Sequence, residues 1–189
     1  TGADLENAIL TGAKLITDGT NTAKLMGATL TGAKLSKADL TGADLGANSG
    51  TATNLVGADL TGAILKNADL ASAILVNDTV GSKGANLEKA DLNGADLTAT
   101  VFSVTHSVSD VVTAANLTSA ILTSANLASQ DLTGVDFEKA DLSGADLTGA
   151  DQENAILTGA KLITDGTNTE KLMGATLTGA KLIKADLTG

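Results

Sequence analysis

Carboxylates are the most abundant chemically active side chains in this sequence, and some of them recur at fixed spacing. The chain has 22 Asp and Glu residues, and Asp39 and Asp59 are twenty positions apart. Two carboxyl groups that face each other across a sugar can hydrolyse a glycosidic bond as acid and base. That chemistry requires a cleft between them, so its feasibility depends on the elements that hold these residues.

Nucleophilic catalysis has little support in this sequence. Cysteine is absent, which excludes a thiolate nucleophile and a disulfide. His106 is the single histidine, and it stands between Thr105 and Ser107. Adjacent positions do not form a catalytic triad, since a triad depends on spatial geometry. We therefore interpret His106 as a loop residue and predict that the protein is not an enzyme.

A calcium site is the one metal site that the sequence suggests. Asp18, followed by Gly19, Thr20 and Asn21, offers oxygen ligands, and Asp165 begins a second copy of the same segment. Calcium loops contain more acidic residues than this. We interpret both segments as turns and predict no bound metal or cofactor.

The elements that must position these residues repeat every five positions. Stepping by five from Leu5 to Val80, and again from Leu87 to Leu187, divides the sequence into 37 five-residue frames. The residue reached at each step is called the centre of its frame. Leucine occupies the centre of 28 frames, and alanine stands two places earlier in 26. A 3.6-residue helix would spread such leucines around its circumference, which excludes an amphipathic helix. Instead, the two apolar positions predict a short extended segment with both side chains on one side, and the residues that follow, often Thr-Gly, predict a corner.

The segment Ala-Asp-Leu-Thr-Gly, at residues 38–42, 58–62, 145–149 and 185–189, resembles the pentapeptide-repeat family. This resemblance implies an all-β fold, a right-handed quadrilateral β-helix with four pentapeptides per coil and about nine coils. One such β-solenoid would cover residues 1–189. The centre residues would form its core, and we expect the following to be buried: Leu30, Leu35, Leu40, Leu60, Leu92, Leu97, Phe102, Phe137, Leu142 and Leu147.

Five breaks interrupt the leucine pattern. Clusters of Asp, Asn, Gly and Ser at these places predict short bulging loops. The loop residues we expect are Asp18, Gly19, Asn48, Gly50, Asp78, Gly81, His106, Asp165 and Gly166. If each broken frame still forms one side of a coil, successive loops project from opposite sides of the rod. If the broken frame is excluded from the coil, each loop lies one side further round the rod than the loop before it. In a regular coil, residues twenty apart would stack, which predicts that Asp39 stacks with Asp59, Lys14 with Lys34, and Lys161 with Lys181.

Residues 148–189 duplicate residues 1–42 at an offset of 147, and only three positions differ. The two copies match at their exposed positions as well as at their apolar positions, although solenoid packing does not constrain the exposed ones. The duplication therefore indicates a higher-order tandem repeat. Leu5 becomes Gln152, a polar residue at a core position, which requires either buried hydrogen-bond partners or a locally open coil.

Composition and charge restrict the function. The net charge of -10 argues against direct nucleic-acid binding, and no apolar run is long enough to predict a membrane span. The repeat predicts a structural or interaction rod, a segment of a longer bacterial fibre or surface protein that pairs with itself end to end. Its composition favours an extracellular or cell-surface location. The family resemblance implies an alternative, a mimic of DNA that binds DNA gyrase. A remote alternative is ice binding, suggested by Thr11, Thr31, Thr41 and Thr61.

Overall fold

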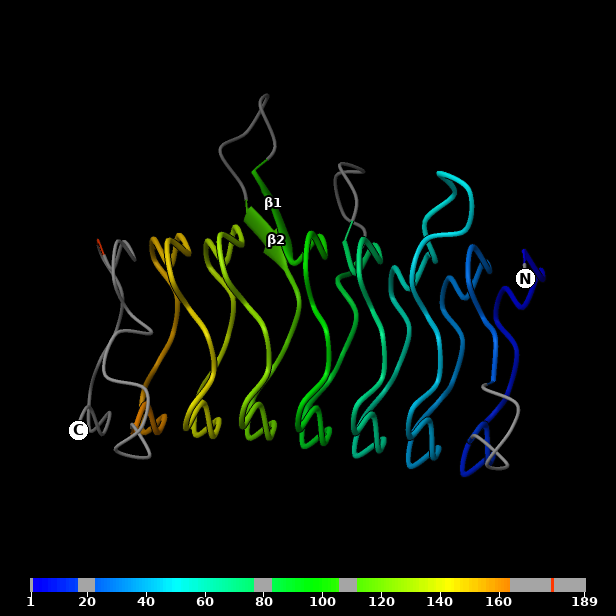
Figure 1. The fold of residues 1–189 in the computed structure, drawn as a ribbon, viewed down its shortest axis with the longest axis horizontal. Coiled ribbons are helices and arrows are strands. Elements are labelled where there is room, and N and C mark those ends of the chain that lie inside the picture. The colour runs from blue at the N-terminus through cyan, green and yellow to red at the C-terminus, as the bar shows by residue number, and fades with distance from the viewer. Residues whose placement is uncertain (1, 17–22, 77–82, 106–111, 164–177, 179–189) are drawn as a thin grey trace.

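The protein is a stack of four-sided coils. The computed structural model describes residues 2–16, 23–76, 83–105, 112–163 and 178. The described chain progresses steadily along the longest axis of the molecule, from residue 2 at one end towards residue 163 (Figure 1). Nearly every side of a described coil contributes one residue that pairs in parallel with the corresponding residue of the next coil.

These pairing residues, one place before each centre, form four ladders that define faces A to D. Face A carries Asp4, Thr29, Asn54, Ile74 and Val101, which pair in series, and then Asp131 and Asp151, which form a separate pair. Face B carries Ile9, Lys34, Asp59, Asn86, Asn116, Asp136 and Ile156. Face C carries Lys14, Asp39, Ile64, Asp91, Ile121, Asp141 and Lys161. Face D carries Lys24, Asp44, Asp69, Asp96, Asn126 and Asp146.

Backbone hydrogen bonds join each coil to both neighbours. On face A, the Thr29 N–H donates to the Ala3 carbonyl of the coil before (2.9 Å), and the Leu30 N–H donates to the Asn54 carbonyl of the coil after (2.7 Å). The sides are so short that they pair at isolated positions. Within the described residues, the only longer strands are β1 (Ser103–Thr105) and β2 (Val112–Ala114), which pair antiparallel.

A tight turn forms each regular corner. The carbonyl of the centre leucine accepts a hydrogen bond from the residue three positions later, as Leu10 does from Ala13 (2.9 Å). The second of the two intervening residues has a positive φ, +68° at Gly12. A positive φ at this position is the signature of a type II turn, which explains why glycine is frequent there. Lys37 and Ala99 adopt the same conformation with φ of +58° and +54°.

The leucine and alanine side chains point into the coil and fill it. Every core residue expected from the sequence is at most 2% exposed. Phe102 and Phe137 are among the largest fully buried side chains. Burying a leucine contributes roughly 1.5–3 kcal/mol, so this narrow interior supplies the main stabilisation of the stack.

The breaks in the leucine pattern are enlarged corners. Ala85 donates to the carbonyl of Leu75, and Ala115 donates to that of Phe102 (both 2.8 Å). This is the hydrogen bond of a regular corner turn, but a longer excursion replaces the two central residues. The β1–β2 hairpin is one such excursion and rises from the body (Figure 1).

The broken frames are therefore excluded from the sides. The estimate of nine coils counted them as sides. Up to residue 162, that count gives 32 sides, or eight coils. The described residues instead complete six coils, which begin on face A at Asp4, Thr29, Asn54, Ile74, Val101 and Asp131, and three sides of a seventh. The first three breaks fall successively between faces C and D, D and A, and A and B. The hairpin leaves from the same corner as the third break.

A buried hydroxyl anchors the break at residues 46–51. Thr53 is fully buried, and its Oγ1 contacts the carbonyls of Gly46 (2.9 Å) and Leu25 (3.0 Å) and accepts from the Gly27 N–H (2.9 Å). Beyond this anchor, Asn48 and Thr51 exchange backbone hydrogen bonds of 2.8 and 2.9 Å. The polar loop thus remains outside while its base is fixed to two coils.

Gln152 meets neither expectation for a polar residue in the core. Its side chain is 0% exposed, so the coil is not open at this position. Among the described residues, neither its Oε1 nor its Nε2 has a hydrogen-bond partner. An orphaned buried polar group destabilises a fold by about 1–3 kcal/mol. This duplicate of Leu5 is therefore a local weakness in the seventh coil.

We expect Gln152→Leu to raise the free energy of unfolding by about 1–3 kcal/mol, because it removes the orphaned amide and restores the usual centre residue. Chemical denaturation followed by circular dichroism would measure the change. Leu132→Gln, one coil earlier on the same face, is the matched reverse variant and should lower stability by at least as much. A Gln152→Leu variant that is no more stable than the parent would show that the amide is satisfied.

Candidate interaction surface

The outer ladders do not have the register expected from regular twenty-residue coils. Asp39 does not stack with Asp59, nor Lys14 with Lys34; instead, Lys14 pairs with Asp39, and Lys34 pairs with Asp59. The step between these coils is 25 residues, because an excluded break lies in each. Exclusion thereby replaces like-charge neighbours with opposite-charge neighbours, which is electrostatically favourable. Lys181 lies outside the described residues, and Lys161 pairs with Asp141.

Most Asp and Asn residues of the ladders stabilise the corners. The Oδ1 of Asp39 accepts a hydrogen bond from the Thr41 N–H at 3.1 Å, and also from the Thr41 hydroxyl at 2.7 Å. A side-chain oxygen that binds the N–H two residues later forms an Asx turn. The other residues whose Oδ1 binds the backbone in this way are Asp4, Asp44, Asn54, Asp59, Asp69, Asn86, Asp91, Asp96, Asn116, Asn126, Asp131, Asp136, Asp141, Asp146 and Asp151.

The sequence analysis did not predict this role of the Asp and Asn residues in the corners. The sequence does contain a signal for this role, because in many frames an Asp or Asn stands directly before the leucine that leads into a turn. Much of the net charge of -10 is therefore a consequence of how the corners are built. Acidity alone is correspondingly weak support for a basic ligand.

Side-chain ladders add a second set of contacts between coils. The Asn86 amide donates to Thr61 Oγ1 (3.0 Å), and the Asn116 amide donates to Asn86 Oδ1 (3.1 Å). Salt bridges join Lys66 to Asp91 (3.2 Å) and Lys161 to Asp141 (3.5 Å). Their lysine side chains are at least half exposed, so each ion pair contributes little by itself.

Two ladder carboxylates have a lowered pKa. Partial burial raises the pKa of Asp59, but hydrogen bonds from the side chains of Ser36 and Thr61, the Thr61 N–H and the charge of Lys34 outweigh it. Partial burial likewise opposes the shift at Asp141, where Ser143 and Lys161 hold the pKa of the carboxyl below its ordinary value. Both groups are thus stabilised in their charged form by the folded coil.

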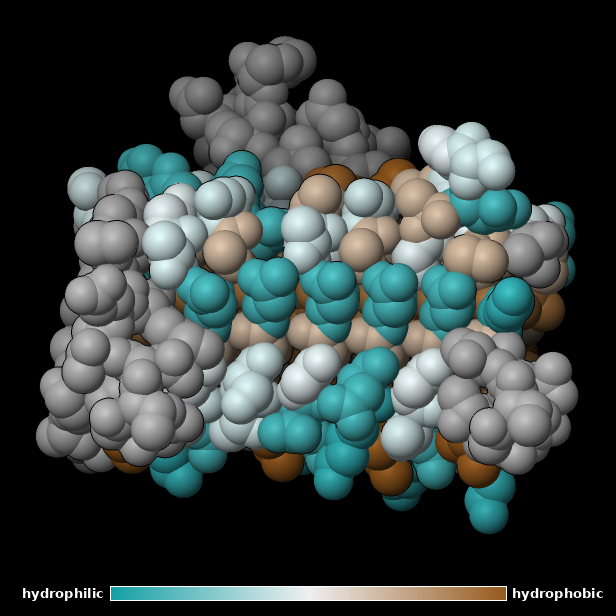
Figure 2. Space-filling model, in the orientation of Figure 1, coloured by the Kyte–Doolittle hydropathy of each residue, from teal (hydrophilic) through white to brown (hydrophobic). Residues whose placement is uncertain are grey.

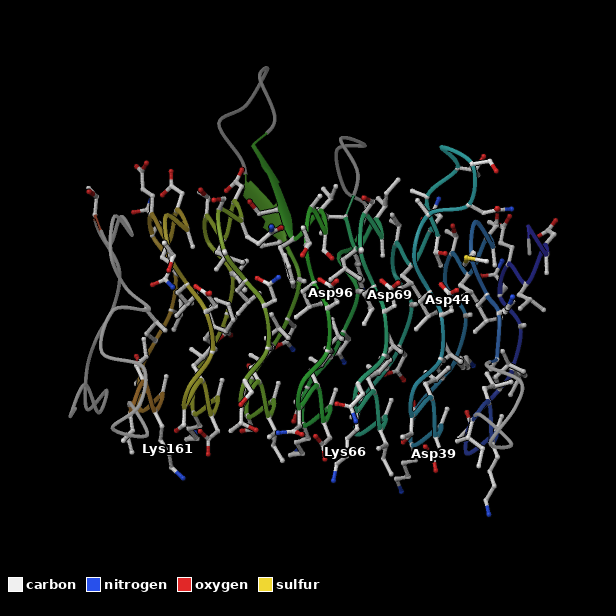
Figure 3. All side chains as sticks on the ribbon, viewed as in Figure 1. Asp39, Asp44, Lys66, Asp69, Asp96 and Lys161 are labelled. Atoms are coloured by element: carbon white, nitrogen blue, oxygen red, sulfur yellow. The ribbon has the colours of Figure 1, made fainter. Side chains whose placement is uncertain are left out.

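Among the described residues, face D carries four ladder aspartates, one more than face A or face C. Asp44, Asp69 and Asp96 lie on three consecutive coils, and a row of hydrophilic side chains runs along the middle of this view (Figures 2 and 3). Each of the three carboxylates binds the backbone of its own corner. Faces B and C instead carry lysine, asparagine and isoleucine between their acids. Among the described residues, only face D has ladder carboxylates on three consecutive coils, whereas face A has Asp131 and Asp151 on two neighbouring coils.

The remaining predicted site residues are only partly described. Asn48 and Gly50 lie on the turn at residues 46–51, where Gly50 is exposed and has a φ of +88°. The other predicted loop and calcium residues lie outside the described residues: Asp18, Gly19, Asp78, Gly81, His106, Asp165 and Gly166. Among the side chains that the structure does place, no group of three or more His, Asp and Glu could hold a metal ion.

The threonines that suggested ice binding do not form one array. Thr11 and Thr61 lie on the corner between faces B and C, Thr31 lies between faces A and B, and Thr41 lies between faces C and D. On the corner of Thr11 and Thr61, Ser36 and Glu88 occupy the corresponding positions of neighbouring coils. The described part of the chain also contains no helix long and apolar enough to cross a membrane.

Comparison with known proteins agrees with this geometry. A family model described as pentapeptide repeats matches residues 23–45, 51–77, 83–103, 113–149 and 139–163, in eight copies. The chain is 34% identical to HetL, a pentapeptide repeat protein involved in heterocyst differentiation regulation in the cyanobacterium Nostoc; the TM-score is 0.54, over 99% of this chain and 71% of HetL. Trypsin-treated QnrB1, a plasmid-mediated fluoroquinolone resistance protein, is 19% identical with a TM-score of 0.59, over 99% of this chain and 82% of QnrB1. No protein sequence with a curated function matches.

We expect acid to destabilise the coil through its carboxylates. Because the pKa values of Asp59 and Asp141 are lowered on folding, the stability they add is complete above the ordinary aspartate pKa of about 4 and is lost as pH falls through the folded values. Thermal unfolding from pH 6 to pH 2 would show this as a fall in Tm below about pH 4. A constant Tm across that range would contradict the expectation.

Substitutions at Asp59 separate its charge from its hydrogen bonds. Asp59→Asn retains an acceptor for the Thr61 N–H, as Asn54 and Asn86 do in the same position, and should weaken the acid dependence of stability. Asp59→Ala removes the acceptor and should lower the free energy of unfolding at pH 7 by about 1 kcal/mol. Equal stability of the two variants at pH 7 would show that the Asx turn contributes nothing.

Proposed function

The chain belongs to the pentapeptide-repeat family, and we propose that it is a rigid, non-catalytic rod that presents its outer faces and corners to other proteins. The observation that carries this proposal is the continuity of the stack. The ladders of faces B, C and D run without interruption through all described coils. HetL and QnrB1 are right-handed quadrilateral β-helices, and we extend the same handedness to this coil.

A filled interior and paired backbone favour a structural role. The centre leucines and the alanines before them occupy the space inside the coil, and short backbone hydrogen bonds join successive coils. Solenoids with such nearest-neighbour contacts are elongated and expose extended binding surfaces. We therefore propose that the recognition elements are the corner loops and the face ladders. Their arrangement suits a component of a bacterial fibre or surface layer.

End-to-end self-association is part of this proposal. Leu5, Leu10 and Leu15 of the first coil are partly exposed, whereas Leu30 and Leu35 of the second coil are completely buried. The backbone of the first described coil pairs with the second coil, and a coil of another copy placed against its other face could pair in the same way. A second copy of the chain would supply both apolar contact and backbone partners.

The acidic ladder of face D supports one alternative, the imitation of duplex DNA towards DNA gyrase. Asp44, Asp69 and Asp96 recur once per coil, at the usual spacing of about 4.8 Å between paired strands. Phosphates of one DNA strand recur every 3.4 Å along the helix axis, so the match in spacing is loose. The likeness to QnrB1 is a likeness of fold, and lysines on faces B and C dilute the negative charge. We therefore rank this function second.

Self-association through the first coil should depend on its exposed leucines. We expect the parent chain to form concentration-dependent oligomers in sedimentation velocity experiments and short rods in electron micrographs. Leu10→Lys should shift the distribution towards monomer, because a charge on that end opposes apolar contact. Thr61→Lys, at a corner in the middle of the rod and away from its end, is the matched control and should leave the distribution unchanged. Monodisperse monomers of the parent at high concentration would contradict end-to-end stacking.

Gyrase recognition would depend on the charge of face D. A triple variant with Asn at positions 44, 69 and 96 keeps an acceptor for every corner and removes three charges. We expect neither the parent nor this variant to inhibit or protect gyrase in a supercoiling assay at micromolar concentrations. If the parent chain does affect gyrase, the triple variant should lose that effect. A control variant with Asn at positions 59, 91 and 136, on faces B and C, should retain it, and only this combination would support the alternative.

A further inference from the structure

The duplicated segments occupy the same faces of the coil. Asp4 and its duplicate Asp151 both lie on face A, Ile9 and Ile156 on face B, and Lys14 and Lys161 on face C. On faces B and C, an unbroken series of six paired steps leads from each residue to its own duplicate. The 147-residue offset therefore corresponds to six complete coils, with no remaining side.

This agreement depends on how the breaks are accommodated. From Ile9, the six steps reach Lys34, Asp59, Asn86, Asn116, Asp136 and Ile156, and only the last two have the regular length of twenty residues. The first four steps are longer because each contains an excursion at a corner. If the broken frames were sides, the 29 frames between duplicates would leave one side beyond seven coils, and Asp151 would lie on the face next to that of Asp4.

We propose that the 147-residue unit is a translational module of the rod, so that units joined in tandem stack in phase and present identical edges along one line. Six coils at about 4.8 Å give an axial repeat of about 29 Å. Every edge would then recur in line at that spacing, including the corner between faces A and B from which the hairpin rises (Figure 1). Such a rod suits a partner that binds in several copies, or one with several equivalent sites. This inference rests on the proposed rod function.

A distance between labels on duplicated positions tests the phase. The chain contains no cysteine, so Lys14→Cys and Lys161→Cys, both at exposed positions, would give unique sites for nitroxide labels. We expect a single distance near 29 Å, broadened by the label linkers, in pulsed electron paramagnetic resonance. A substantially longer or bimodal distance would place the labels on different faces and overturn the proposal.

Two variants of altered chain length test whether the faces of the coil, and not the number of residues between the labels, determine the label distance. Deletion of residues 46–50 joins Leu45 to Thr51 and restores the five-residue period through Asn54 and Leu55, so an excluded frame is removed and the distance should not change. Insertion of Ala-Asp-Leu-Thr-Gly after Gly42 adds one regular side, moves Lys161→Cys to the next face and should lengthen the distance. The opposite result, a change on deletion and none on insertion, would refute the proposal.

Small-angle scattering distinguishes failure of the in-phase module from failure of the proposed rod function. The labelled chains should be elongated with one common cross-section, and a chain with an additional copy of residues 1–147 before residue 1 should be longer by about 29 Å. Elongated chains with displaced labels would overturn the in-phase module and leave the rod function standing. Compact chains, or an extended chain of greater width, would overturn both.

Discussion

A side of this coil is too short to be stable by itself. It offers one inward leucine, one inward alanine and a few backbone groups, and these acquire partners only when another coil lies above or below. The hydrogen bonds from the Leu30 N–H to the next coil and from the Thr29 N–H to the previous one show this dependence. All other features, including the filled interior, the corner turns and the outer ladders, require that coil-to-coil pairing.

The corners follow from the same constraint. A side that must return to register after five residues needs a tight turn with a positive φ, and glycine adopts that conformation most easily. Lysine, serine and alanine also occupy this position, at a modest cost in strain that the neighbouring coils sustain. Asp and Asn one place before the centre compensate by binding the first N–H of the turn. The acidic composition of the molecule thus reflects its backbone geometry more than any ligand.

The sequence predicted those structural features that the residues of a single five-residue frame determine. The leucine period identified the buried centres, and Thr-Gly identified the corners, because each is decided by residues within five positions. The ladder partners of Asp39 and Asp59 could not be inferred in this way, since they depend on whether a distant break is counted as a side. The paired strands β1 and β2 lie where the sequence predicts only a bulging loop, although their valines and threonines favour strands. Gln152, whose side-chain amide has no partner among the described residues, shows that a centre position can also hold a buried polar group.

The unequal length of the coils has a mechanical consequence. Because each coil contacts only its neighbours, a pulling force applied at one end would detach the coils one after another. A regular coil of twenty residues would release about 70 Å of chain, and the coil that includes the β1–β2 hairpin, with a step of thirty from Asn86 to Asn116, about 100 Å. The force–extension curve of a single molecule would therefore be an uneven series of steps, and the order of long and short steps would report the positions of the loops along the rod.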